Sequence, residues 1–156
     1  MSEELARPIE AAGHSVRLFA SPGEFLDVFH PRMPGCLLTE IDLPCLTSAE
    51  GLRIRSNDSL TKISIPVTEL TTLTISKNES LADIDGLSDL TTVWDAEFES
   101  NDALTNIDGL SNVSSFASLV IDNNDALHDL DGLHNVSEIT FGDLIIDNND
   151  SLVDIH

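Results

Sequence analysis

The sequence predicts a mainly β fold, a parallel β-solenoid of about five coils over residues 46–156, preceded by a short α/β cap over residues 1–45. Three observations predict the solenoid. A unit that opens on Asn recurs along the chain, and apolar residues at fixed places in the unit line up as columns. Aromatic residues make up only 4% of the chain, and there is no tyrosine. A core with so few aromatic residues must be built from Leu, Ile and Val, and stacked repeats build a core of this kind.

The repeating unit begins Asn-Asp/Glu-Ser/Ala-Leu, and successive units start 21, 23, 23 and 25 residues apart. The starts are Asn57, Asn78, Asn101, Asn124 and Asn149. Aligning them gives three apolar columns: Leu60, Leu81, Leu104, Leu127 and Leu152; Ile63, Ile84, Ile107, Leu130 and Ile155; Leu70, Val93, Phe116 and Ile139. The unit closes with two apolar residues separated by one residue, an alternation typical of a strand. These pairs are Leu52 and Ile54, Leu73 and Ile75, Ala96 and Phe98, Leu119 and Ile121, Leu144 and Ile146.

Two recurrent polar motifs are assigned to turns. Asp-Gly-Leu recurs at residues 85–87, 108–110 and 131–133, and we expect its glycine to adopt a positive φ. The recurrent Asn is expected to form a ladder, in which its short amide binds backbone groups at a bend.

The pattern xLxIxxNxxLxxIxGLxxL over about residues 46–156 resembles the leucine-rich-like repeats of receptor L domains, especially those of bacterial surface proteins. That resemblance implies a right-handed solenoid used for binding rather than catalysis. Consistent with it, we find no nucleophile–base pair and no Gly-rich phosphate loop. The sequence therefore predicts no enzyme and no cofactor.

The N-terminal segment is expected to run helix, strand, helix over residues 4–30, followed by a buried strand over residues 35–41. Residues 13–26 and 37–44 resemble part of the receiver domain of response regulators. Glu40 occupies the position of the phosphoacceptor Asp, and the further carboxylates needed for Mg²⁺ are missing. We therefore expect a degenerate receiver without phosphoacceptor activity, which caps the solenoid.

The net charge is −21, and residues 56–156 contribute −18 of it. Such a chain repels nucleic acids and anionic membranes and attracts cations or basic partners. No apolar run reaches the roughly 18 residues of a membrane span. Cys36 and Cys45 form no zinc motif or disulfide framework, and Cys36 is expected to be a buried, reduced thiol.

The outward side of the closing strand is the candidate binding site. If the coils stack in register, two parallel rows form on one sheet face. The first row is Arg53, Thr74, Glu97, Val120 and Ile145, and the second is Arg55, Ser76, Glu99, Asp122 and Asp147. The rows run from basic to acidic and include an apolar patch at Val120 and Ile145. They are predicted to recognise a protein or a glycan; the alternatives are an ordinary solvated face and a face covered by sequence that is missing here.

Two groups of polar residues offer weaker candidates. Asp83-Ile84-Asp85-Gly86 and Asp129-Leu130-Asp131-Gly132 are similar to calcium loops, but the middle residue belongs to a core column, which favours turns over weak calcium binding. His128 and His134 could bind zinc together with a nearby Asp, but they occupy positions filled by Thr or Ser in the preceding coil, which favours exposed side chains. No metal site is predicted.

The leading hypothesis is a non-catalytic binding module. The alternatives are a degenerate signalling protein and a truncated fragment without independent function, since the array stops inside a coil at Ile155-His156. An uncapped coil of this kind predicts end-to-end self-association. No signal peptide is recognised, so a cytoplasmic location is expected, or a surface location if the true N-terminus lies outside this sequence.

Overall fold

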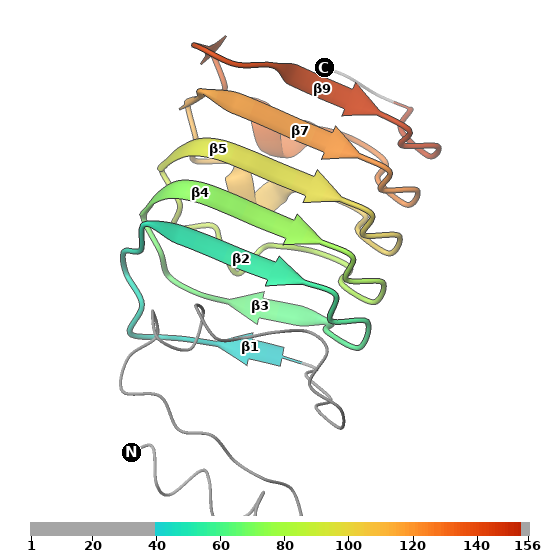
Figure 1. The fold of residues 1–156 in the computed structure, drawn as a ribbon, viewed down its shortest axis with the longest axis horizontal. Helices are drawn as coiled ribbons and strands as arrows, with labels where there is room; N and C mark the ends of the chain where they lie inside the picture. The colour runs from blue at the N-terminus through green and yellow to red at the C-terminus, as the bar shows by residue number, and fades with distance from the viewer. Residues whose placement is uncertain (1–39, 154–156) are drawn as a thin grey trace, which may run out of the picture. The chain divides into compact units, whose positions relative to one another are not determined.

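The computed structural model describes residues 40–153, which form a parallel β-solenoid of about five turns with almost no helix, as the sequence predicts. Five strands, one from each coil, lie side by side in a parallel sheet, called the main sheet here, in the order β2-β4-β5-β7-β9 (Figure 1). They are β2 (Gly51–Arg55), β4 (Glu69–Ser76), β5 (Thr92–Glu99), β7 (Ser118–Asp122) and β9 (Leu144–Asp147). The chain climbs from coil to coil with a right-handed turn.

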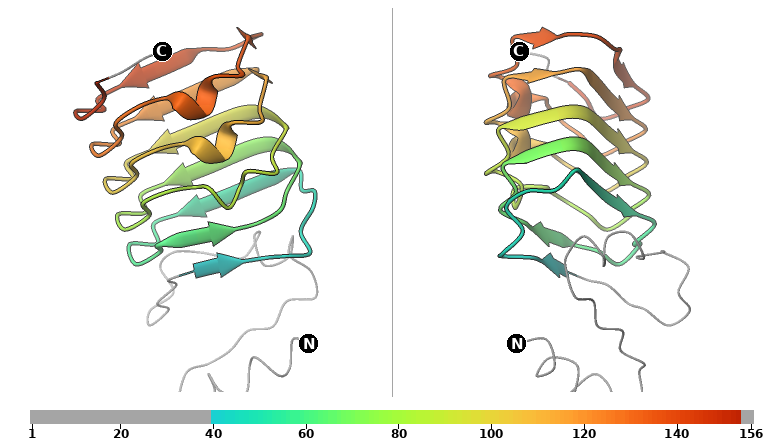
Figure 2. Two further views of the ribbon diagram at one scale, coloured as in Figure 1. Left: turned by 180° about the vertical axis from the view of Figure 1, so that it is seen from behind. Right: turned by 60° about the vertical axis from the view of Figure 1, so that its left-hand side comes forward.

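The other sides of the coil carry shorter elements (Figure 2). They are the paired strands β1 (Glu40–Asp42) and β3 (Lys62–Ser64), the paired strands β6 (Ser115–Phe116) and β8 (Glu138–Ile139), and the 3₁₀ turns η1 (Asp108–Leu110) and η2 (Asp131–Leu133). Since β4 and β5 are eight residues long, each continues around the corner that separates β6 from β7 in the fourth coil. One coil therefore contributes a main strand, a turn, a return segment and a corner.

The predicted apolar columns form the core. Leu60, Leu81, Leu104 and Leu127 are fully buried, and the closing pairs of β2, β4, β5 and β7 are at most 3% exposed. The closing pair of β9 differs, since Leu144 is 55% exposed. Its outer side meets no further coil among the described residues. An apolar residue of a column is therefore fully buried, and stabilises the fold most, only where its coil has a neighbouring coil on both sides.

The predicted asparagine ladder is confirmed. The backbone and side-chain amides of Asn78 both donate to Oδ1 of Asn101, at 3.2 and 3.1 Å, and Asn101 repeats this pattern on Asn124 at 3.1 Å. Asn78, Asn101 and Asn124 are fully buried. Each also binds a strand carbonyl, as Asn101 Nδ2 does with Ile75 O at 2.9 Å. Since these groups satisfy one another in a dry interior, the ladder explains why Asn recurs at the start of each unit.

The role expected for the Asp-Gly-Leu glycines is wrong. None of Gly86, Gly109 and Gly132 has a positive φ; a Cβ on them would lie 1.8–2.1 Å from a carbonyl oxygen of the preceding coil. Glycine is required there because two backbones approach closely. The left-handed residues instead precede each ladder asparagine, and none is glycine: Ser56, Lys77, Ser100, Asn123 and Asn148, with φ between 51° and 58°.

The solenoid extends back to at least β1. Glu40, Ile41 and Asp42 pair in parallel with β3, and Ile41 is 5% exposed. Residues 40–45, which the sequence analysis assigns to the cap, thus stack on the second coil. The helices and strand expected over residues 4–30, the receiver-like motifs before Glu40 and Cys36 lie outside the described residues. Cys45 is a free, exposed thiol.

Candidate binding surfaces

The two outward rows of the main sheet form in the predicted register. Arg53 pairs with Thr74, Thr74 with Glu97, Glu97 with Val120 and Val120 with Ile145. The second row runs in the same way from Arg55 on β2 to Asp147 on β9. The regular register follows because equivalent positions of each unit bury apolar side chains on the other side of the sheet.

The rows are not equally accessible. Thr74 and Ser76 are only 6% and 3% exposed, so the centre of the face on β4 is covered. An ion pair spans this strand, from Arg55 Nη2 on β2 to Glu97 Oε2 on β5 at 3.6 Å. Both side chains are about half exposed, so the pair contributes only about 0–1 kcal/mol. The pair therefore spans part of the face and adds little to the stability of the fold.

Arg53 and Arg55 are exposed at the β2 end of the face, and the accessible apolar part of the face lies on β7 and β9. Ile145 is 42% exposed and lies next to the half-buried Val120. Acidic side chains border this pair, and Asn148 Nδ2 donates to Asp122 Oδ1 at 2.9 Å. A small apolar patch bordered by acids is the kind of surface that contacts a partner.

The acidic turns serve the backbone, as expected. Asp83 Oδ1 accepts from Asp85 N at 3.2 Å, and Asp129 Oδ1 accepts from Asp131 N at 3.1 Å. Burial raises the pKa of Asp85 above its ordinary value of 3.8, and the charges of Asp83 and Asp108 raise it further. In the stretch from residue 40 to residue 153, no three His, Cys, Asp or Glu side chains converge on a metal position.

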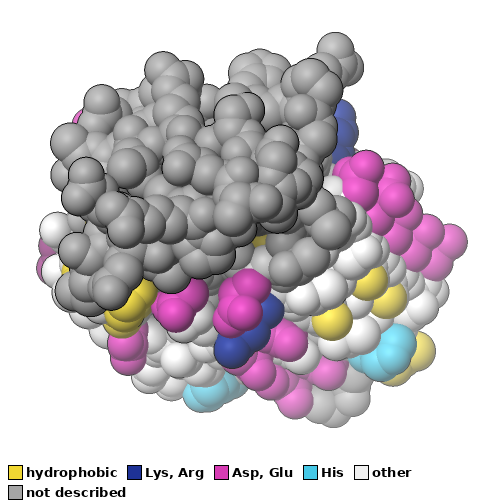
Figure 3. Space-filling view, turned by 90° about the horizontal axis from the view of Figure 1, so that it is seen from below, with side chains coloured by type: hydrophobic (Ala, Val, Ile, Leu, Met, Phe, Trp, Pro, Cys, Tyr) yellow, Lys and Arg dark blue, Asp and Glu magenta, His cyan; other side chains and the backbone are white. Residues whose placement is uncertain are grey.

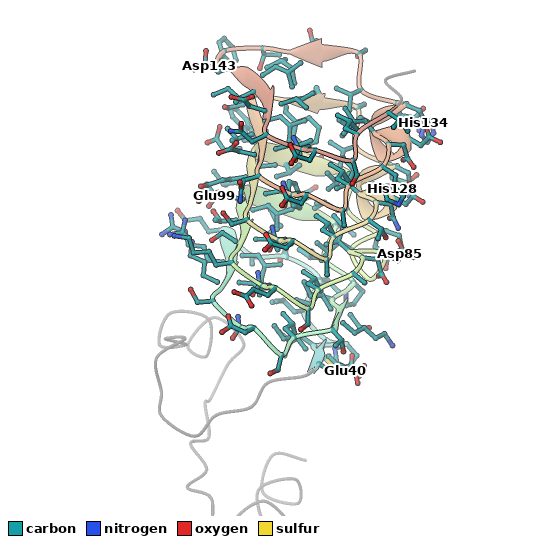
Figure 4. The ribbon with its side chains drawn as sticks, turned by 90° about the vertical axis from the view of Figure 1, so that its right-hand side faces the viewer. Glu40, Asp85, Glu99, His128, His134 and Asp143 are labelled. Atoms are coloured by element: carbon teal, nitrogen blue, oxygen red, sulfur yellow. The ribbon has the colours of Figure 1, made fainter. Side chains whose placement is uncertain are left out.

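The two histidines lie on the side of the 3₁₀ turns, away from the main sheet on which Glu99 lies (Figure 4). Both are exposed. The ring of His134 binds locally, through Nδ1 to Asp131 O at 2.8 Å and Nε2 to Asn135 Nδ2 at 3.0 Å. These bonds occupy both ring nitrogens, so the ring links residues of the turn in which it lies.

Glu40 lies on β1, at an exposed position, and pairs in register with Lys62 on β3. Its Oε1 is 3.4 Å from Lys62 Nζ. This environment is a cross-strand ion pair on the solenoid surface. Across the visible surface of the described part, acidic side chains are widespread and Lys and Arg are few (Figure 3).

A groove that was not predicted from the sequence lies at the corner where β4 and β5 begin. Its volume is about 290 Å³, and Trp94 on β5 forms part of its wall. Trp94 is 57% exposed, and Phe141 of the last coil is 87% exposed, whereas Phe98 and Phe116 are buried. A signal was present in the sequence: the chain's one tryptophan stands where the preceding unit has Thr71.

Comparison of the chain with models of known protein families, with curated proteins and with solved structures finds no significant match. Within residues 40–153, no helix is long and apolar enough to cross a membrane.

Proposed function

We propose that this protein is a non-catalytic binding module that recognises a protein or glycan partner through the outward face of the main sheet. The contact surface is centred on Val120 and Ile145 and bordered by Asp122 and Asp147. The resemblance of the repeat to receptor L domains, which are binding modules, supports the proposal.

The observation that carries the proposal is the placement of Ile145 beside Val120 on an otherwise polar face. Their parallel register puts both side chains on the same side of the sheet, and Ile145 remains 42% exposed. Val120 is not part of the core, because Leu119 and Ile121 of the same strand point to the other side of the sheet and are fully buried. Apolar side chains that contribute little to the fold and face solvent together are typical of a contact surface.

Replacement of Val120 and Ile145 by lysine tests the proposal. The full chain is immobilised and exposed to an extract of its source, and retained proteins and glycans are identified by mass spectrometry. The matched control places lysine at His128 and Ser88, which are exposed outside the main sheet, so the added charge is the same. A partner that the control retains and the Val120/Ile145 variant loses at least about tenfold supports the proposal. Equal retention by both variants would refute it.

A further inference from the structure

The groove at the corner is assembled from three successive coils. Its walls are formed by Ser48 and Glu50 of the first, Glu69 and Thr71 of the second, and Thr92 and Trp94 of the third. The coils are held together here by backbone bonds, with Thr71 N and Thr72 N donating to Glu50 O at 2.9 and 3.1 Å. The backbone position of each lining residue is therefore set by the solenoid itself. No residue of the two rows on the main sheet lines the groove.

The chemistry of the groove is an exposed aromatic face beside unpaired carboxylates. Trp94 keeps 57% of its surface exposed, in a chain whose aromatic residues are scarce. Glu50 and Glu69 are exposed, and the two ion pairs recorded among residues 40–153 involve other acids, Glu97 and Glu40. Hydroxyl groups of Ser48, Thr71 and Thr92 add further hydrogen-bond acceptors.

We propose that this groove binds an arginine side chain of a basic peptide segment. A guanidinium group stacks on the face of a tryptophan and donates in pairs to carboxylates, so it satisfies both kinds of wall at once. The net charge of −21 attracts a basic segment from a distance. A groove of about 290 Å³ accommodates one long side chain rather than a folded element. This site is independent of the main-sheet face, so either proposal can fail alone.

Because the chain has one tryptophan and no tyrosine, its fluorescence reports directly on the groove. The full chain is titrated with a short glycine peptide that carries two arginines, and Trp94 emission is followed at low salt. A saturable change in emission is expected. The same peptide with citrulline in place of arginine keeps the shape and loses the charge, and its binding is expected to be at least about tenfold weaker.

Neutralising the Glu50 and Glu69 carboxylates tests whether they contribute to binding of the arginine peptide. The double variant Glu50→Gln, Glu69→Gln is expected to bind the arginine peptide at least about tenfold more weakly. The matched control, Glu79→Gln with Glu138→Gln, removes the same charge from exposed acids outside the groove and is expected to stay within about twofold of the original chain. Trp94→Leu, measured by calorimetry, is expected to weaken binding as well. Far-UV circular dichroism and urea midpoints establish that all variants fold.

Three results would overturn the proposal. One is an unchanged Trp94 emission at saturating peptide in a chain that binds it by calorimetry. Another is equal weakening in the groove variant and its matched control, which would mean that only the long-range field attracts the peptide. The third is stronger binding of a neutral oligosaccharide such as maltotriose than of the arginine peptide, which would assign the groove to a hydroxyl-rich ligand.

Discussion

Replacing Asn101 by alanine removes the centre of the asparagine ladder. The Asn101 side chain takes part in four hydrogen bonds: two accepted from Asn78, one donated to Ile75 O and one donated to Asn124 Oδ1. Asn78, Asn101 and Asn124 are fully buried. The substitution thus leaves the Asn78 backbone amide and the Ile75 carbonyl without these partners inside the protein.

The expected loss follows from these bonds. Each buried hydrogen bond contributes about 1 kcal/mol net, and a backbone group left unsatisfied costs about 1–3 kcal/mol. Two of the four lost bonds leave a backbone group unsatisfied, so the free energy of unfolding is expected to fall by about 4–8 kcal/mol, a large part of the roughly 5–15 kcal/mol available to a domain. Asn149→Ala provides the matched control. Asn149 also takes part in four bonds, but it is half-buried, so water replaces them and the expected loss is about 1–2 kcal/mol.

Urea unfolding followed by far-UV circular dichroism and by Trp94 fluorescence measures both losses. Trp94 lies on β5, the strand that leads directly into Asn101, so its emission reports on the coil that the substitution disrupts. Equal losses for Asn101→Ala and Asn149→Ala would refute the argument from burial. A loss below about 1 kcal/mol for Asn101→Ala would refute the argument that the ladder stabilises the fold.

The remaining expected outcomes concern two glycines, Lys77, Asp85 and self-association. Gly109→Ala should destabilise the protein by at least about 2 kcal/mol in urea unfolding, since its Cβ would lie 2.1 Å from a carbonyl oxygen. Gly51→Ala should cost less, because its nearest neighbour is a side-chain hydroxyl. Lys77→Asn should stabilise by about 0.5–1 kcal/mol, because asparagine tolerates the left-handed backbone better than lysine. Asp85→Asn should raise the urea midpoint at neutral pH, and the gain should vanish in acid. Because folding raises the pKa of Asp85, the folded state binds the proton more tightly, and stability is present below pH 3.8 and lost as pH rises through the folded pKa. Light scattering should show association of the chain at rising salt, which screens its charge, and Leu144→Lys should prevent it.

Each of these outcomes has a result that contradicts it. Equal costs at Gly109 and Gly51 would show that the close approach does not decide the choice of glycine. Lys77→Gln as stabilising as Lys77→Asn would assign the gain to charge rather than to backbone conformation. A gain from Asp85→Asn that persists at pH 3 would exclude the linkage to its titration. A strictly monomeric chain at all salt concentrations would show that the exposed apolar side of the last coil does not associate.

The architecture could be predicted from the sequence because the residues that produce it, buried Leu and bend-forming Asn, recur in every unit. Leu at the same place in every unit requires the same inward direction, and Asn at every bend requires the same partner on the next coil. Stacking in register is the arrangement that satisfies both, so the main sheet and its outward rows follow. The reason for the recurrent glycine was predicted wrongly, because a close approach between coils leaves no local signal in the sequence.

Only the tertiary structure decided which outward side chains are exposed and which of them lie together on the surface. The repeat specifies that Thr74 and Ser76 point outward, yet both are buried, and an ion pair between Arg55 and Glu97 of the neighbouring coils spans their strand. The groove beside Trp94 likewise combines residues more than forty positions apart, from Ser48 to Trp94. The sequence by itself determined the stack, because burial acts on every unit alike. Only the packed coils determined which side chains meet on the outside, because that depends on neighbours across coils.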